Sequence, residues 1–310
     1  MEQTFMKEKK ILPLVLSMSL PMMLSMLVNS LYNIVDSYFV AQISEQAMTA
    51  LSLVYPLQLL ETAIAVGFGI GMNAAAAYYL GAKEQQRADD IVTSGLILSL
   101  LHGVILMAAA LLFAPAFVSL FTENEKILAE GVKYSNLVFI FAVPNVIAIT
   151  FEKIFQAEGR MKVSMLSMLC GCVANIILDP LLIFGIGIFP KMGIEGAAIA
   201  TGIGQVIPLI VYLFIFIKHP VSLHFHWHEK VFQKRLMGQM YGVGIPATLN
   251  LALPSFMITA LNGILAVYSA SYVLVLGIYY KLQTFIYLSA NGIVQGIRPI
   301  ISYNYGAGER

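Results

Sequence analysis

The chain has 310 residues, of which 59% are hydrophobic and only 11% are charged, with a formal net charge of +1. Soluble domains carry about 25% charged residues, so this composition and a mean hydropathy of +0.81 exclude an ordinary soluble domain and indicate a polytopic membrane protein. A near-neutral chain argues against a nucleic-acid partner. Its two cysteines, Cys170 and Cys172, are too close for a normal disulfide and have no further cysteines to form a zinc site.

Eight apolar segments follow one another along the chain. Each is long enough to cross a hydrocarbon core of about 30 Å as a helix. They are residues 11–40, 52–80, 93–118, 134–158, 163–188, 197–217, 237–266 and 272–303. The first is too long for a signal peptide and shows no clear cleavage site, so we predict that it is a transmembrane helix. The expected fold class is therefore an all-α polytopic membrane protein.

The Lys and Arg residues between these segments predict how the chain is oriented. One side would carry Lys7, Lys9, Lys10, Lys83, Arg87, Arg160, Lys162, Lys218, Lys230, Lys234, Arg235 and Arg310. The other side would carry only Lys126, Lys133 and Lys191. Because loops rich in Lys and Arg stay in the cytoplasm, we expect a multi-pass protein of the cytoplasmic membrane with its N-terminus and residue 310 on the cytoplasmic side.

The start of the chain recurs, without a gap, 225 residues later. Pro21 recurs as Pro246, and the residues that follow it in the repeat are Tyr55, Leu57, Gln58, Gly67, Gly71, Tyr78, Gly81, Ala82 and Glu84, matched by Tyr280, Leu282, Gln283, Gly292, Gly296, Tyr303, Gly306, Ala307 and Glu309. One period holds six segments, an even number, so both copies run in the same sense and predict two lobes related by an axis along the membrane normal.

This repeat divides the chain into three predicted parts. Residues 1–217 would form a six-helix lobe, residues 218–236 a cytoplasmic loop between lobes, and residues 237–310 the first two helices of a second lobe. By the same logic about four more spans would complete the second copy, so we expect the chain to be a fragment of a longer carrier that does not transport by itself.

The first predicted helix carries a polar face made of Ser25, Asn29, Asn33 and Asp36, spaced four, four and three residues apart. Residues at these spacings share one side of a helix, and that side must face a bundle or a wet cavity because lipid offers no hydrogen bonds. An ionisable residue inside a membrane usually has a function. The alternative is a buried polar network that only packs helices.

The fifth and sixth helices carry a second polar group. Asn175 and Asp179 lie four residues apart, and Pro180 cannot donate to the carbonyl of Ile176, which leaves that oxygen free. A carboxylate, an amide and a free carbonyl form a hard-oxygen environment suited to a small cation. Alternatively, the Asp-Pro pair marks a helix end near the interface. The next helix places Thr201 and Gln205 on one face.

The two copies differ in these polar residues, because Asp36 is replaced by Leu261 at the matching position of the second copy. We therefore expect the cation chemistry in the first lobe. Elsewhere, Glu152 is followed by Lys153, for which pairing with a nearby charge and reaching the interface both stay open.

Three histidines alternate in the loop segment His224-Phe225-His226-Trp227-His228. Alternating histidines can bind metal, but no acid or cysteine cluster in the sequence completes the set. We favour an interfacial loop with an aromatic anchor over a metal site.

Several motifs in order resemble one family. They are Pro21 with Asp36, Gly71 through Gly81-Ala82, Gln156-Ala157-Glu158-Gly159-Arg160, Asn175 through Asp179-Pro180, Gly196-Ala197-Ala198 with Thr201, Gln295-Gly296, Pro299, and Tyr303 through Ala307. Together, over the whole chain, they resemble the MATE (multidrug and toxic compound extrusion) carriers of the bacterial DinF-like or MepA-like type. The resemblance implies twelve helices in two lobes around a central cavity, with exchange of Na⁺ or H⁺ for organic cations.

The resemblance also implies roles for individual residues. The coupling-ion site would be formed by Asp36, Asn175, Asp179 and Thr201, and these would also be the ligands of a Na⁺ ion. Pro21 would be the hinge that bends the first helix. Residues expected to line the substrate cavity are Met22, Asn29, Tyr32, Asn33, Met168 and Gln205. Flexible Met side chains suit a promiscuous pocket, although ordinary helix packing explains them nearly as well.

The expected function is thus multidrug efflux by cation-coupled antiport and alternating access. The substrates would be small organic cationic or amphipathic compounds, the coupling ion H⁺ or Na⁺, and the protein a monomer among membrane lipids, with no other cofactor. One alternative is a lipid-linked oligosaccharide flippase of related architecture, although the deep charges of the first lobe are mainly acids rather than arginines. The other, a membrane-embedded enzyme, lacks a nucleophile, metal-ligand set or cofactor loop.

Overall fold

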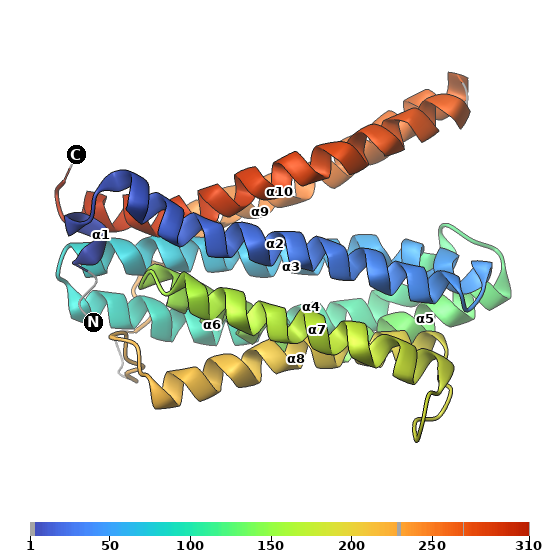
Figure 1. Ribbon diagram of the computed structural model, residues 1–310, viewed down its shortest axis with the longest axis horizontal. Helices are drawn as coiled ribbons and strands as arrows, with labels where there is room; N and C mark the ends of the chain where they lie inside the picture. Colours follow the sequence, from blue (N-terminus) through green and yellow to red (C-terminus); the bar gives the residue numbers. More distant parts are fainter. Residues whose placement is uncertain (1–3, 228–230, 269, 310) are drawn as a thin grey trace.

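The computed structural model describes residues 4–227, 231–268 and 270–309, and these residues form helices and loops without a strand (Figure 1). Lys230, His228 and Arg310, which the sequence analysis assigned to loops, lie outside the described residues. The helices are α1 (Phe5–Glu8), α2 (Ile11–Ala41), α3 (Glu45–Gly81), α4 (Gln85–Ser119), α5 (Glu125–Ile140), α6 (Ala142–Ala157), α7 (Met161–Phe184), α8 (Ile194–Lys218), α9 (Lys234–Tyr268) and α10 (Ala270–Gly306).

Five of these helices, α2, α3, α4, α7 and α8, are each long and apolar enough to cross a membrane within the described part of the chain. The predicted fourth segment, 134–158, is a bent pair, because α5 and α6 meet at Phe141 with an angle of 46° and count together as a sixth span. Pro144, in the first turn of α6, cannot donate to the carbonyl of Ile140, so the helix breaks there. The all-α membrane fold expected from the sequence is confirmed.

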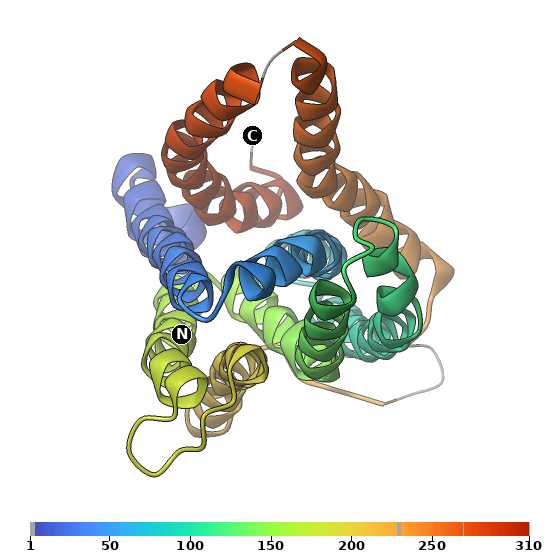
Figure 2. The ribbon, with the colours of Figure 1, turned by 90° about the vertical axis from the view of Figure 1, so that its right-hand side faces the viewer.

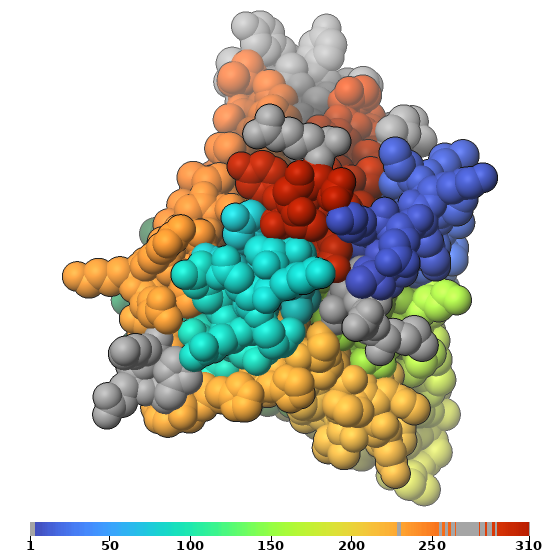
Figure 3. Space-filling view, turned by 90° about the vertical axis from the view of Figure 1, so that its left-hand side faces the viewer, coloured from blue at the N-terminus to red at the C-terminus, as the bar shows by residue number. Residues whose placement is uncertain are grey.

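The connections gather at two ends of the helix bundle (Figures 1 and 2). One end holds both termini, the α3–α4 and α6–α7 connections and the segment between α8 and α9, which are the connections expected to carry most of the Lys and Arg residues. We call this the terminal end; in Figure 3 the α3–α4 connection (cyan) lies at its centre. At this end an ion pair of 2.5 Å joins Lys7, near the N-terminus, to Glu309, near the end of the described chain. The hydrogen bond with Glu309 raises the pKa of Lys7.

The two copies of the repeat meet in a seam of reciprocal contacts. A Cβ placed on Gly81 of α3 would overlap the backbone carbonyl of Tyr303, and a Cβ on Gly306 of α10 would overlap that of Tyr78. Gly306 is the repeat partner of Gly81, and Tyr303 is the partner of Tyr78. Each contact is therefore the image of the other, as a two-fold axis between the copies requires.

The same reciprocity continues along the seam. Gly67 touches Thr248, and its repeat partner Gly292 touches Met23, which is the repeat partner of Thr248. One further pair obeys the rule, with Gly71 against Gly244 and Gly296 against Ser19. Small residues let helix backbones approach closely inside a membrane. The glycines that recur in the sequence are thus the positions at which α3 meets α9, α2 meets α10, and α3 meets α10.

The seam occupies only part of the length of these helices. Its contacts involve residues 19–23, 67–81, 240–248 and 292–306, which lie toward the terminal end. Beyond them, α9 and α10 diverge from the other helices toward the opposite end (Figure 1). Helices α9 and α10 therefore contact α2 and α3 closely toward the terminal end and spread away from them toward the other end (Figure 1).

Candidate functional site

Two acids from different helices meet inside the first lobe. Asp36 lies near the end of α2 and is 8% exposed, and Asp179 lies in α7 and is completely buried. Their carboxyl groups interact directly, and in the described part of the chain neither forms an ion pair with a Lys or Arg. Two facing buried carboxylates cannot both hold a negative charge at low cost, and a proton or a small cation between them would lower that cost.

Asn175 joins this pair to α8. With its amide nitrogen toward the acid, Asn175 donates to Oδ2 of Asp179 at 3.1 Å, and its carbonyl oxygen accepts the backbone N–H of Thr201 at 3.2 Å. The two helices come this close because Gly171 of α7 faces the backbone of Gly204 in α8, where a Cβ would not fit. The four residues predicted to form a coupling-ion site therefore come together from α2, α7 and α8.

In the described part of the chain, two oxygens of this group are buried without a hydrogen-bond partner in good geometry. They are Oδ1 of Asp36 and Oγ1 of Thr201. Buried polar atoms are almost always paired, so an orphaned oxygen needs an explanation, such as a water or an ion. Carboxylate and hydroxyl oxygens are the donors that a hard cation such as Na⁺ prefers, and the same carboxylates can hold a proton. The residues present fit either coupling ion.

The alternative explanations of these two faces fare differently. Pro180 does not mark the end of α7, because the helix continues to Phe184; the helix-end interpretation is wrong. On α2, by contrast, Asn33 donates to the backbone carbonyl of Asn29 at 2.8 Å, and Ser25 donates to that of Pro21 at 2.8 Å. These two side chains are bonded within their own helix, whereas Oδ1 of Asp36 is buried without a partner in the described part of the chain.

Sequence reasoning missed two neighbours of the site. Tyr134 of α5 is 1% exposed and lies beside Thr201, Asp36 and the side chain of Gln58 in α3. The repeat included Gln58 without giving it a role, and Tyr134 is a lone tyrosine in an apolar segment, where no periodic pattern distinguishes it from a packing residue. The packing of α5 on α3 and α8 brings it to the acids.

The residues predicted to line the substrate cavity differ in how deeply they are buried. Met22 is completely buried, where its sulfur accepts from the amide of Gln156 at 3.7 Å. Those that are partly buried are Asn29, Tyr32, Asn33, Met168 and Gln205. Tyr32 lies near both acids of the site, and Oε1 of Gln205 is buried without a partner. Pro21 lies inside the continuous helix α2. Their roles in transport stay predictions.

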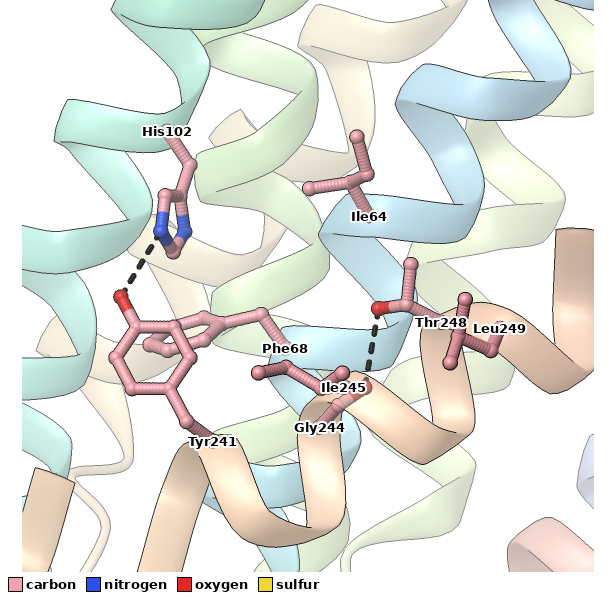
Figure 4. Close-up of a pocket in the computed structure, with 8 residues that line it drawn as sticks. All are labelled: Ile64, Phe68, His102, Tyr241, Gly244, Ile245, Thr248 and Leu249. Carbon is pink, nitrogen blue, oxygen red and sulfur yellow. Dashed lines mark hydrogen bonds between the residues drawn. The ribbon is translucent and has the colours of Figure 1, made fainter. Parts of the chain in front are cut away.

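A separate cavity of about 180 Å³ lies between α3, α4 and α9 (Figure 4). Its walls are mainly apolar, and its polar contacts are one of 3.0 Å between the hydroxyl of Tyr241 and Nε2 of His102 and one of 3.0 Å from the hydroxyl of Thr248 to the carbonyl of Gly244. It shares no residue with the predicted substrate cavity and contains no acid. Nothing in its lining suits the chemistry expected of the site.

The question left open by Glu152 and Lys153 is answered by a buried network. Lys153 is 1% exposed, and its Nζ lies 2.8 Å from Glu152, 3.1 Å from Oε1 of Gln156 and 3.4 Å from Oε1 of Gln295 in α10. The lysine pairs with nearby groups and does not reach the interface. Because Gln295 belongs to the second copy, this network links the two lobes beside the seam.

A continuous bundle with buried acids in one lobe and a parallel repeat is the architecture of a secondary transporter. Residues 21–181 match the family model MatE, and the chain belongs to the MatE family. Two similar curated proteins are the multidrug export proteins MepA of Staphylococcus aureus (strain MRSA252) and Staphylococcus haemolyticus (strain JCSC1435), each 28% identical over 98% of this chain and 67% of their own length. Membership in a transporter family agrees with the expectation that the chain is not an enzyme.

Solved structures share the fold. A MATE transporter in complex with MaD3S superposes with a TM-score of 0.92 at 23% identity, covering 99% of this chain and 69% of the other. A MOP superfamily transporter from Pyrococcus furiosus gives 0.90 at 23% identity, covering 99% and 68%. An outward-facing multidrug resistance MATE transporter gives 0.89 at 23%, covering 99% and 67%. The chain is thus a multi-pass membrane protein that spans about two thirds of the length of these relatives.

Proposed function

We propose that the chain serves cation-coupled multidrug efflux, exchanging H⁺ or Na⁺ for small organic, often aromatic, cations. The observation that carries this proposal is the meeting of Asp36 and Asp179, two buried carboxyl groups without a basic partner in the described chain, beside the orphaned hydroxyl of Thr201. The similar MepA proteins are multidrug exporters by name, which supports the class of substrate. The bacterial cytoplasmic membrane, with the terminal end in the cytoplasm, is the location proposed.

In this mechanism the acids hold either the coupling ion or an interaction with the substrate. The inward gradient of H⁺ or Na⁺ loads Asp36 and Asp179 from the outer side, which neutralises them and weakens the hold on a cationic substrate. Competition is direct or acts through a bend of α2 at Pro21, which lies inside that helix. The spread of α9 and α10 away from the terminal end fits a state that is open to the outside (Figure 1).

The test measures efflux of ethidium from vesicles that hold the completed protein, in which the chain is joined to the further spans that its repeat predicts, driven separately by a Na⁺ or an H⁺ gradient. We expect efflux under one gradient, which names the coupling ion, and loss of it in Asp36→Asn. The matched control is Glu61→Gln, because Glu61 is also a buried acid of the first lobe but is bonded by Asn145 at 3.0 Å, outside the site. Intact coupled efflux in the Asp36→Asn variant refutes the assignment.

The same vesicles separate this function from the alternative. No efflux under either gradient, with the protein folded and inserted, argues against antiport and favours the lipid-linked oligosaccharide flippase, which would be tested by lipid accumulation on deletion. Binding of ²²Na⁺ to the purified 310-residue chain adds a readout that needs no transport. Binding that Asp36→Asn abolishes and Glu61→Gln leaves intact would support Na⁺ as the ion.

A further inference from the structure

Between α8 and α9 the structure describes residues 219–227 and 231–233, which we call the inter-lobe segment, and acids at the terminal end hold its first part against the first lobe. Oε1 of Glu158 accepts both the backbone N–H and the hydroxyl of Ser222, at 2.5 and 2.7 Å. Oδ1 of Asp89, in the second turn of α4, accepts the backbone N–H of His224 at 2.9 Å. These hydrogen bonds to Ser222 and to the backbone of His224 fix the segment without using the histidine side chains.

An aromatic residue sets which way these histidines point. Phe225 packs against Phe151 and Phe216, with ring centroids 6.1 and 5.5 Å apart. In an extended chain, alternate residues point to opposite sides, so His224 and His226 share the side away from this aromatic cluster. Their rings lie side by side, with centroids 5.9 Å apart and an angle of 31°.

The carboxylate of Asp89 completes this group. Asp89 is 5% exposed, and its Oδ1 is fixed by the backbone of His224 and by the side chain of Gln85, each at 2.9 Å. Its Oδ2 lies 3.9 Å from Nε2 of His226. One ligand atom from each of Asp89, His224 and His226 lies within 4.8 Å of the other two. The acid that the sequence analysis found missing beside the histidines is supplied by α4, so that objection to a metal site was wrong.

We propose that Asp89, His224 and His226 form a binding site for a transition-metal ion of the Zn²⁺ class at the terminal end. Two imidazoles and one carboxylate are typical of zinc, with a water at the fourth position. Ligand atoms around a tetrahedral zinc lie about 3.3 Å apart, so the three groups need to close by at most about 1.5 Å. His224 and His226 are exposed and free to turn on their side-chain bonds, while Asp89 stays fixed. Magnesium and calcium, which need several oxygens, do not suit this set.

The proposed site lies where the inter-lobe segment crosses α4. The inter-lobe segment leads directly into α9, the first helix of the second copy, and α4 belongs to the first lobe. Further contacts, from Gln233 to Oδ2 of Asp90 at 3.3 Å and from the backbone N–H of His226 to Oγ1 of Thr93 at 3.2 Å, run along the same stretch of α4. A bound ion would fasten this segment to α4 beside the entry to the second lobe.

The test is a titration of the purified 310-residue chain, prepared without a polyhistidine tag, with ZnCl₂ in competition with a chromophoric chelator. We expect one Zn²⁺ per chain. His224→Ala combined with His226→Ala should weaken binding by about 100-fold or more, since even outer-shell changes cost about 10- to 100-fold. Asp89→Asn keeps an oxygen for the backbone of His224 but loses the charge, and should weaken binding by at least about tenfold.

His219→Ala is the matched control, because His219 belongs to the same segment but is bonded through its backbone: its carbonyl accepts from Arg160 at 2.8 Å and its N–H donates to Ile215 at 2.7 Å. Zinc binding that survives in the double histidine variant, or that is absent from the unchanged chain, overturns the proposal. Co²⁺ gives a second readout, since a tetrahedral site produces visible absorption bands that the double variant should lose. Both readouts are independent of transport, so Asp36→Asn should bind zinc normally.

Discussion

Adding one methyl group at Gly81 should loosen the contact between the two lobes. A Cβ at this position would lie 2.7 Å from the carbonyl carbon of Tyr303 and 3.0 Å from its Cα, whereas ordinary contact begins at 3.4 Å. The obstacle is backbone, which cannot turn aside as a side chain can, so α3 and α10 must separate locally by at least about 0.7 Å. Overpacking of this kind costs about 1–3 kcal/mol.

The melting temperature of the purified chain provides the measurement. A maleimide dye that fluoresces on reaction with thiols reports unfolding through Cys170 and Cys172, which are free and at most partly exposed. At about 2 °C per kcal/mol for a chain of this size, Gly81→Ala should melt about 2–6 °C lower. Gly306→Ala should show a similar drop, because its Cβ would lie 2.8 Å from the carbonyl carbon of Tyr78.

Two further variants make this reasoning refutable. Gly242→Ala, in α9, meets nothing within 4 Å and should be neutral or slightly stabilising, because Ala favours a helix over Gly by about 0.5–1 kcal/mol. The double variant at Gly81 and Gly306 should lose less than the sum of its parts, since one separation of the helices serves both methyl groups. A Gly81→Ala chain that melts like Gly242→Ala would show that the seam does not restrain the lobes.

Two more predictions follow from charges. Lys153→Met should destabilise the chain by about 3–5 kcal/mol, because it leaves Glu152 buried without its partner at 2.8 Å. Adding Glu152→Gln to this variant should restore most of the lost stability in the same melting assay. Equal losses of stability in the single and double variants would contradict this prediction. At the terminal end, Glu309 raises the pKa of Lys7, so the stability that this ion pair adds is present below pH 10.5 and is lost as pH rises through the folded-state pKa. The difference in melting temperature between the unchanged chain and Lys7→Met should therefore shrink above pH 10.5. A difference that grows above pH 10.5 would be incompatible with the ion pair.

The sequence predicts the features that recur along the chain and those that place polar residues inside the membrane, where they cost free energy. The parallel repeat follows from recurring glycines, and the polar faces of Asp36 and of Asn175 with Asp179 stand out because such residues are rare inside membranes. Periodicity within one helix cannot show which residue on another helix faces it. For that reason Tyr134 beside Thr201, and Asp89 beside the histidines 135 and 137 residues later, needed the folded chain.

The break between α5 and α6 shows a second limit. Residues 134–158 form one apolar stretch, and its period gives no sign of an interruption. The signal is local chemistry, a proline at residue 144 in the first turn of the second helix, and not hydrophobicity. A prediction based on apolar length alone therefore found the span but missed its bend of 46°.

The reciprocal contacts of the seam describe what two separate halves would need to assemble. An interface in which each contact is the image of another is the interface of a symmetric homodimer. The first copy presents residues 19–23 and 67–81 in the geometry that two identical copies would use, although it meets Thr248 and Gly244 where an identical copy would place Met23 and Ser19. Joining both copies in one chain freed them to diverge, and the replacement of Asp36 by Leu261 is a division of labour that no homodimer can achieve.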